Sequence, residues 1–73
     1  MRGNAVEAAD VDFVMPVYNE GPNIGRALAE LYQHVPLPKR VLVVHDFDED
    51  NTVPAVRELA PLYPGVELIR NTL

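Results

Sequence analysis

The chain has 73 residues, of which 48% are hydrophobic and 23% charged, and it contains no cysteine. This composition is typical of one small globular domain and excludes a disulfide scaffold, a thiol site and a fibrous or disordered chain. The formal net charge of -5 argues against nucleic-acid binding, and no apolar run approaches the ~20 residues needed to cross a bilayer.

The first half of the chain predicts a strand, a turn and a helix. Residues 1–10 mix small, polar and charged side chains without a sustained period, so we expect a disordered lead-in. The apolar run at residues 11–17 predicts a strand that is covered on both faces. A Gly-Pro pair then requires a turn, and apolar residues at three- and four-residue steps predict a helix over residues 24–35.

The second half predicts two more strands on either side of a second helix. After two prolines that end the first helix, four consecutive apolar residues at 41–44 predict a parallel strand that is buried on both faces. A second helix is expected from Thr52 to about Ala60, where a proline follows. Residues 66–70 predict a third strand after a Pro-Gly turn.

The predicted fold class is therefore α/β, with the order β-α-β-α-β. Right-handed crossovers place both helices on one face of three parallel strands, which is half of a Rossmann-like, doubly wound sheet. Such sheets bind ligands beyond the carboxyl ends of their strands. Those ends carry residues 16–20 and 45–52, so we expect these two polar loops to converge on one edge and form a binding site.

The second of these loops is strongly acidic, with four of the eleven carboxylates in five positions. Asp46 directly follows a buried strand, so we expect its side chain to enter the crevice and accept hydrogen bonds from a base or sugar. We interpret Asp48 and Glu49 as a solvated loop, whereas Asp50 or Thr52 could cap the second helix.

A calcium loop is excluded for the same segment. Counted from Asp46, the EF-hand template requires Gly at the sixth position and Glu at the twelfth, but the chain has Asn51 and Arg57 there. Histidines 34 and 45 have no partner at a spacing typical of a metal or catalytic site.

The first loop is ambiguous when its residues are judged one by one. Tyr18 could bury its ring in the core and keep only its hydroxyl in water. Glu20 stands near a helix start and could serve only the helix dipole.

Three segments taken together resemble family 2 glycosyltransferases: V-M-P-V-Y-N-E at 14–20, V-V-H-D-F-D-E-D-N-T at 43–52 and Y-P-G-V-E-L-I-R-N at 63–71. Within that family they resemble most the dolichol-phosphate mannose synthases and related polyprenyl-phosphate glycosyltransferases. The resemblance implies that residues 11–73 are the N-terminal, nucleotide-binding portion of a GT-A domain. It further implies the following roles: Pro16 and Tyr18 line the base and ribose pocket, Glu20 contacts the nucleoside, and Asp46 hydrogen-bonds the base.

The implied activity is transfer of a sugar from a GDP- or UDP-sugar to a polyprenyl phosphate or another acceptor. The family uses Mg²⁺ or Mn²⁺, but its D-x-D metal motif and its catalytic base would lie beyond Leu73. We therefore expect no metal-binding or catalytic residue in this piece, and no activity from the piece alone. A cytoplasmic location is expected, with any membrane association supplied by C-terminal parts.

Further residues of the acidic segment match or depart from the family pattern. Asp50 and Thr52 match an acidic-x-Thr turn that is chiefly structural in the family. Three positions depart from it: His45, Phe47 and Asp48 stand where Asp, Gly and Ser are common.

Two other functions are consistent with the sequence. The first strand would lack a neighbour on one side, so a non-catalytic remnant or interaction module could self-associate through this open edge. A receiver-like module that uses acidic loop residues for Mg²⁺ is the weaker alternative, because the later Thr and Lys strands of such a module are missing.

Overall fold

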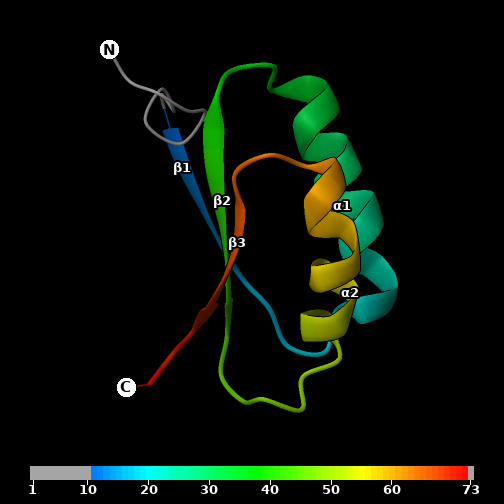
Figure 1. Cartoon of the computed structure of the whole chain (residues 1–73), viewed down its shortest axis with the longest axis vertical. Helices are drawn as coiled ribbons and strands as arrows, with labels where there is room; N and C mark the ends of the chain where they lie inside the picture. The colour runs from blue at the N-terminus through cyan, green and yellow to red at the C-terminus, as the bar shows by residue number, and fades with distance from the viewer. Residues whose placement is uncertain (1–10, 73) are drawn as a thin grey trace.

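The computed structural model describes residues 11–72, which form one three-stranded parallel sheet with two helices on a single face (Figure 1). The strands lie in the order β1-β2-β3, as predicted for half of a Rossmann-like sheet. The expected lead-in at residues 1–10 lies outside the described residues. The elements are β1 (Val11–Pro16), α1 (Gly21–His34), β2 (Lys39–His45), α2 (Thr52–Leu59), the short 3-10 helix η1 (Ala60–Leu62) and β3 (Val66–Arg70).

Only one face of the sheet is buried. In β2 the residues that face the helices are buried, and those between them are half-buried. Val14 in β1 is 66% exposed. The prediction that the first two strands are covered on both faces was therefore wrong, because both helices lie on the same side and the other side meets solvent (Figure 1). Apolar runs alone do not distinguish one covered face from two.

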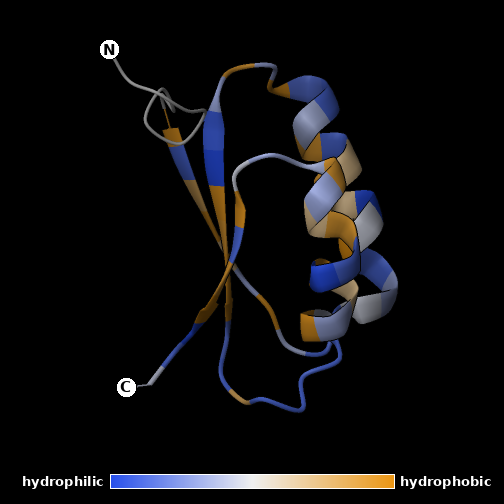
Figure 2. Ribbon diagram, viewed as in Figure 1, coloured by the Kyte–Doolittle hydropathy of each residue, from blue (hydrophilic) through white to orange (hydrophobic). Residues whose placement is uncertain are grey.

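The core lies between this covered face and the two helices. Val41 and Val43 of β2 pack with Ile24 and Leu28, which are one helical turn apart on α1, and with Val56 of α2. Together with Val17, these side chains form the cluster of buried apolar residues at the centre of the core. Figure 2 shows the contrast between the mainly hydrophobic strands and the hydrophilic segment that joins β2 to α2.

Helix α1 begins at Gly21, three residues earlier than predicted. Pro22 is compatible with this start, because the first-turn N–H groups of a helix have no intrahelical partner and proline lacks that donor. The carbonyl of Glu20 already accepts the amides of Asn23 and Ile24 at 2.9 and 2.8 Å. A Gly-Pro pair therefore starts this helix instead of delaying it.

Strand β1 forms one edge of the sheet, and its sequence limits pairing at that edge. Val17 N donates to Val44 O at 2.9 Å, so backbone groups at alternate positions of β1 face β2. Pro16 falls in the other set, where a missing N–H breaks no bond to β2. Asp12 in the same set forms an ion pair with Arg40 across the strands. A proline and a charged residue both reduce the tendency of an edge strand to add another strand.

A buried lysine lies at the amino end of β2. Lys39 is 6% exposed, and its Nζ donates to Val35 O at 2.6 Å and Leu37 O at 3.0 Å. The same ammonium group lies 4.1 Å from the centre of the Tyr32 ring. The chain segment between α1 and β2 is thereby tied to the start of β2.

Within residues 11–72, neither helix has the length and hydropathy that a bilayer crossing requires.

Candidate functional site

Two loops meet at the carboxyl edge of the sheet, as the sequence predicted. We call residues 17–20 between β1 and α1 the first loop, and residues 46–51 between β2 and α2 the acidic loop. Four hydrogen bonds join the first loop and the start of α1 to the acidic loop and the start of α2: Asn19 N to Asp50 Oδ1 (3.0 Å), Glu20 N to Thr52 Oγ1 (2.7 Å), Gly21 N to Asn51 Oδ1 (2.8 Å) and Asn51 N to Asn19 Oδ1 (3.0 Å). The two loops therefore form one connected surface.

The close approach of the loops depends on two backbone features. Asn19 has a φ of 51°, in the left-handed region that asparagine tolerates better than most residues. A Cβ atom on Gly21 would lie 2.7 Å from the carbonyl oxygen of Asn51, which is too close for any side chain. Glycine at this position lets the start of α1 contact the acidic loop.

Asp50 is the centre of the junction between the loops. Its side chain is 1% exposed, and Oδ1 accepts the amide of Thr52 at 2.7 Å as well as that of Asn19. Burial alone raises the pKa of the Asp50 carboxyl, but the hydrogen bonds from Thr52 and Asn19 and the charge of His45 outweigh burial and lower this pKa. A buried carboxylate thus connects the first loop to the beginning of α2.

This arrangement predicts a loss of stability in acid. The folded-state pKa of Asp50 is lower than the unfolded one, so ionisation favours folding above the unfolded value and the benefit disappears as the pH falls through the folded value. We expect the free energy of unfolding, measured with urea, to be nearly level above about pH 5 and to fall below it.

Two variants identify the group responsible for the acid loss. Asp50→Asn should remove most of the decrease in the free energy of unfolding below about pH 5. Asp12→Asn, which removes a carboxyl whose pKa is lowered by its hydrogen bond to Arg40, should keep most of it because that pair is exposed at the surface. If the free energy of unfolding of Asp50→Asn falls with pH as steeply as that of the wild type, Asp50 is not the group responsible.

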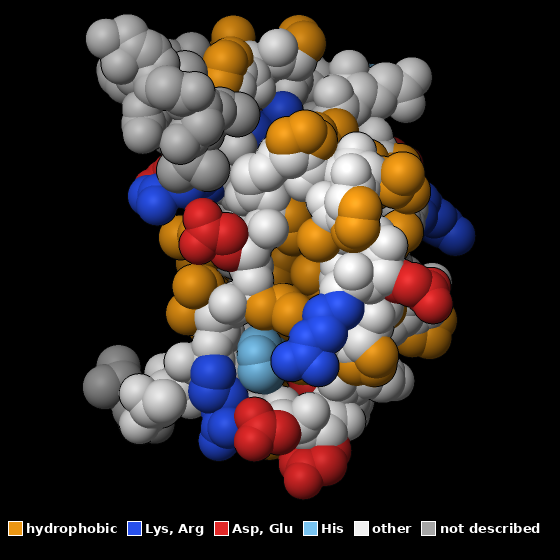
Figure 3. Space-filling model, in the orientation of Figure 1, with side chains coloured by type: hydrophobic (Ala, Val, Ile, Leu, Met, Phe, Trp, Pro, Cys, Tyr) orange, Lys and Arg blue, Asp and Glu red, His pale blue; other side chains and the backbone are white. Residues whose placement is uncertain are grey.

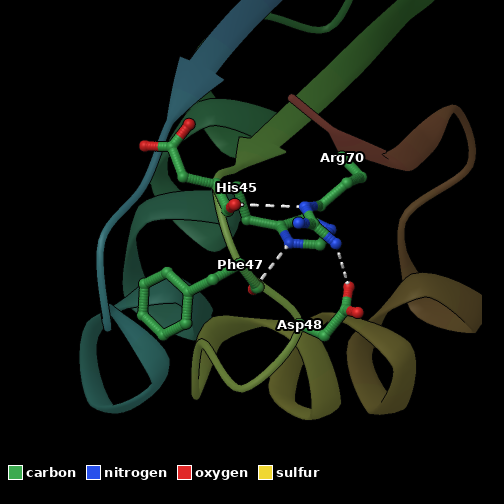
Figure 4. Close-up of polar contacts among 5 residues, drawn as sticks. His45, Phe47, Asp48 and Arg70 are labelled. Carbon is green, nitrogen blue, oxygen red and sulfur yellow. Dashed lines mark hydrogen bonds and ion pairs between the residues drawn. The ribbon is translucent and has the colours of Figure 1, made fainter. Parts of the chain in front are cut away.

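The end of β3 holds Asp46 in place. Asn71 Nδ2 donates to Asp46 Oδ1 at 3.0 Å, and Asn71 N donates to His45 O at 2.8 Å. Arg70 donates from Nε to Asp46 O at 3.1 Å and from Nη1 to Asp48 Oδ1 at 2.6 Å (Figure 4). Asp46 is exposed, but its carboxylate is held by the residue that follows β3. Asp48 is exposed as expected and also forms an ion pair with Arg70.

The other predicted site residues also reach the surface. Pro16 and Glu20 line a hollow of about 220 Å³ beside the start of α1, where Glu20 Oε1 accepts a bond from Asn23 Nδ2 at 3.2 Å. Tyr18 is 70% exposed, so the alternative that its ring belongs to the core was wrong. Its ring centroid lies 5.7 Å from that of Phe47 in the acidic loop. The first loop thus contributes Glu20 to the hollow and Tyr18 to the contact with the acidic loop.

Residues 11–72 form no site for the family's divalent cation, whose ligands the resemblance places beyond Leu73. Among residues 11–72, no three His, Cys, Asp or Glu side chains are grouped so that they could hold an ion. Three of the four carboxylates of the acidic loop have separate partners: Asp46 bonds Asn71, Asp48 bonds Arg70, and Asp50 bonds backbone amides. Acidic and basic side chains accordingly lie side by side at this end of the molecule (Figure 3).

Sequence reasoning missed five residues that build this surface. Asn19 and Asn51 exchange the hydrogen bonds between the loops, and Arg70 and Asn71 hold the acidic loop. Phe47 supplies the second aromatic ring. The rule that parallel strands end at one edge would have indicated Arg70, the last residue of β3, and Asn71, which follows it.

A family model described as glycosyl transferase family 2 matches residues 12–72, which is nearly the whole chain. Neither the curated proteins nor the solved structures contain a match to this chain.

Proposed function

The chain belongs to glycosyl transferase family 2, and we propose that its two joined loops bind the nucleoside of a nucleotide-sugar donor. In the proposed reaction, a sugar passes from a GDP- or UDP-sugar to a polyprenyl phosphate or another acceptor. The observation that supports donor binding most strongly is the exposed Asp46, whose carboxylate accepts a hydrogen bond from Asn71. The next residue, Phe47, contacts the ring of the exposed Tyr18.

Asp46 has the chemistry to recognise a base. Guanine and uracil both present ring N–H groups, and an ionised carboxylate accepts such donors through two oxygens. The hydrogen bond from Asn71 and the bond from Arg70 to the Asp46 carbonyl restrict the carboxylate before any ligand arrives. A group that is already ordered loses less conformational entropy when it binds a ligand.

Tyr18 supplies the complementary apolar contact. Tyr18 is 70% exposed and carries a large apolar ring that a base can contact. Stacking of a base on an aromatic side chain contributes about 1–3 kcal/mol. Glu20 and Pro16, at the neighbouring hollow, are placed to contact the ribose side of the same nucleoside in this proposal.

The finer assignment to the polyprenyl-phosphate branch is part of the proposal and depends on the motif resemblance at residues 14–20 and 43–52. A divalent cation would stabilise the nucleotide diphosphate as a leaving group, but residues 11–72 offer it no ligand set. We therefore assign the described residues to donor binding alone.

Asp46→Asn should lower nucleotide affinity about 10-fold or more, because the amide presents a donor where the base requires an acceptor of charge-assisted bonds. Isothermal titration calorimetry with GDP and with UDP measures this loss. Glu49→Gln is the matched control, since it removes one charge from an exposed position of the same loop. Equal affinities of wild type and Asp46→Asn for both nucleotides would exclude Asp46 from the site.

A second candidate function is association through the open edge of β1, which exposes Val11 and Val14. Pro16 and the paired Asp12 oppose strand addition at this edge, so we rank it below donor binding. Size-exclusion chromatography separates the two: a monomer whose melting temperature rises with nucleotide supports donor binding, and an oligomer indifferent to nucleotide supports association.

A further inference from the structure

Phe47 is a large apolar residue in an otherwise hydrophilic loop, and it does not belong to the hydrophobic core. It is absent from the core cluster of the described residues and from the partly buried side chains packed against that cluster. Its aromatic contact is with Tyr18, in the other loop. Packing of the core therefore does not account for an aromatic ring at this position.

The backbone around Phe47 is held on both sides. Phe47 O lies 3.1 Å from His45 Nδ1 and accepts the amide of Asp50 at 3.3 Å. Arg70 bonds the residues before and after Phe47, through the carbonyl of Asp46 and the carboxylate of Asp48. Figure 4 shows the Phe47 ring pointing away from the side chains of His45 and Arg70. The loop thus presents the ring in a fixed position on the side of the first loop.

The two rings form an angled pair, with a centroid distance of 5.7 Å and an interplanar angle of 58°. At this angle, a base cannot lie flat on Tyr18 and Phe47 at once. A base stacked on one ring meets the other ring along its edge, which is a favourable geometry for aromatic groups. A purine has two fused rings and therefore offers more length than a one-ring pyrimidine for contacting both side chains.

We propose that Phe47 is a specificity-determining residue, which together with Tyr18 makes the donor site prefer a purine nucleotide to a pyrimidine nucleotide. This inference rests on the proposed donor-binding function. In this proposal Asp46 hydrogen-bonds the edge of the base, and the two aromatic rings favour the larger base. A purely structural Phe47 would affect the affinities for both nucleotides alike.

Calorimetric titrations of GDP and UDP against three proteins test the proposal: wild type, Phe47→Leu and Phe47→Tyr. Leucine keeps an apolar side chain of similar reach and removes the ring, and tyrosine restores the ring. We expect wild type to bind GDP more tightly than UDP. Phe47→Leu should lower GDP affinity about five- to tenfold and change UDP affinity less than about twofold, because only the purine loses a contact. Phe47→Tyr should keep the wild-type preference.

The outcomes distinguish failure of the Phe47 selectivity proposal from failure of the donor-binding proposal. If wild type binds nucleotides but Phe47→Leu changes GDP and UDP affinity by the same factor, Phe47 has no part in selectivity and donor binding stands. If wild type binds neither nucleotide at millimolar concentration, both the proposed function and the inference are wrong. Melting temperatures without nucleotide check that the variants are folded, which we expect because Phe47 lies outside the core cluster.

Discussion

Asp50→Ala is expected to lower the free energy of unfolding by about 3 kcal/mol, because it leaves the amides of Asn19 and Thr52 without their charged acceptor. Both amides lie where the two loops join, so water does not replace the carboxylate without separating them. Domains of this size have a total stability of only a few kcal/mol, near the low end of about 5–15 kcal/mol. Urea unfolding followed by circular dichroism measures the loss.

Two further variants test the mechanism of that loss. Asp48→Ala removes a carboxylate from the same loop, but the side chain is 77% exposed and its ion pair with Arg70 should contribute at most about 1 kcal/mol. Asp50→Asn keeps an oxygen that accepts both amides and should fall between the other two variants. If Asp50→Ala costs no more than Asp48→Ala, the carboxylate does not hold the loops together.

Gly65→Ala is the second change with a large expected effect, at least about 2 kcal/mol of lost stability. Gly65 has a φ of 94°, in the region that side chains rarely adopt, and a Cβ atom there would lie 2.2 Å from Lys39 O. The neighbouring backbone has little freedom to move, since Gly65 O accepts the amide of Val41 at 2.8 Å. The same measurement of urea unfolding applies.

Gly25→Ala is the matched control and should increase the free energy of unfolding. Gly25 lies inside α1, and a Cβ atom there meets only Leu59 Cδ1 at 3.6 Å, which is an ordinary contact. Alanine in a helix interior is more favourable than glycine by about 0.5–1 kcal/mol. If both variants shift stability in the same direction, the distinction between the two glycines is wrong.

The sequence predicts the architecture well because its strongest patterns are local. The four apolar residues at 41–44 and the spacing of apolar residues in the first helix predict β2 and α1, and the β-α-β-α-β order then fixes parallel pairing. Two details were wrong for physical reasons. Apolar runs do not reveal which face of a strand is covered, so β1 was expected to be buried on both sides, and Pro22 is compatible with the first turn of a helix, so α1 starts earlier.

The convergence of the two loops followed from topology, but the bonds that join them did not. Asn19 and Asn51 interact across about thirty residues of sequence, and this partnership requires the left-handed φ of Asn19 and the absence of a side chain at Gly21. The support of Asp46 by Asn71 depends in the same way on the register of β3. Nucleoside binding by Pro16, Tyr18, Glu20 and Asp46 stays a prediction.

The most direct test of that prediction is titration of the ¹⁵N-labelled chain with GDP and with UDP, followed by nuclear magnetic resonance. Binding in the proposed place should shift the amide signals of Tyr18, Glu20, Asp46 and Phe47, and should leave Lys39 and Gly65 at the far end of the sheet unchanged. Saturating nucleotide that leaves the two loops unshifted, or that shifts only the far end, would contradict the account.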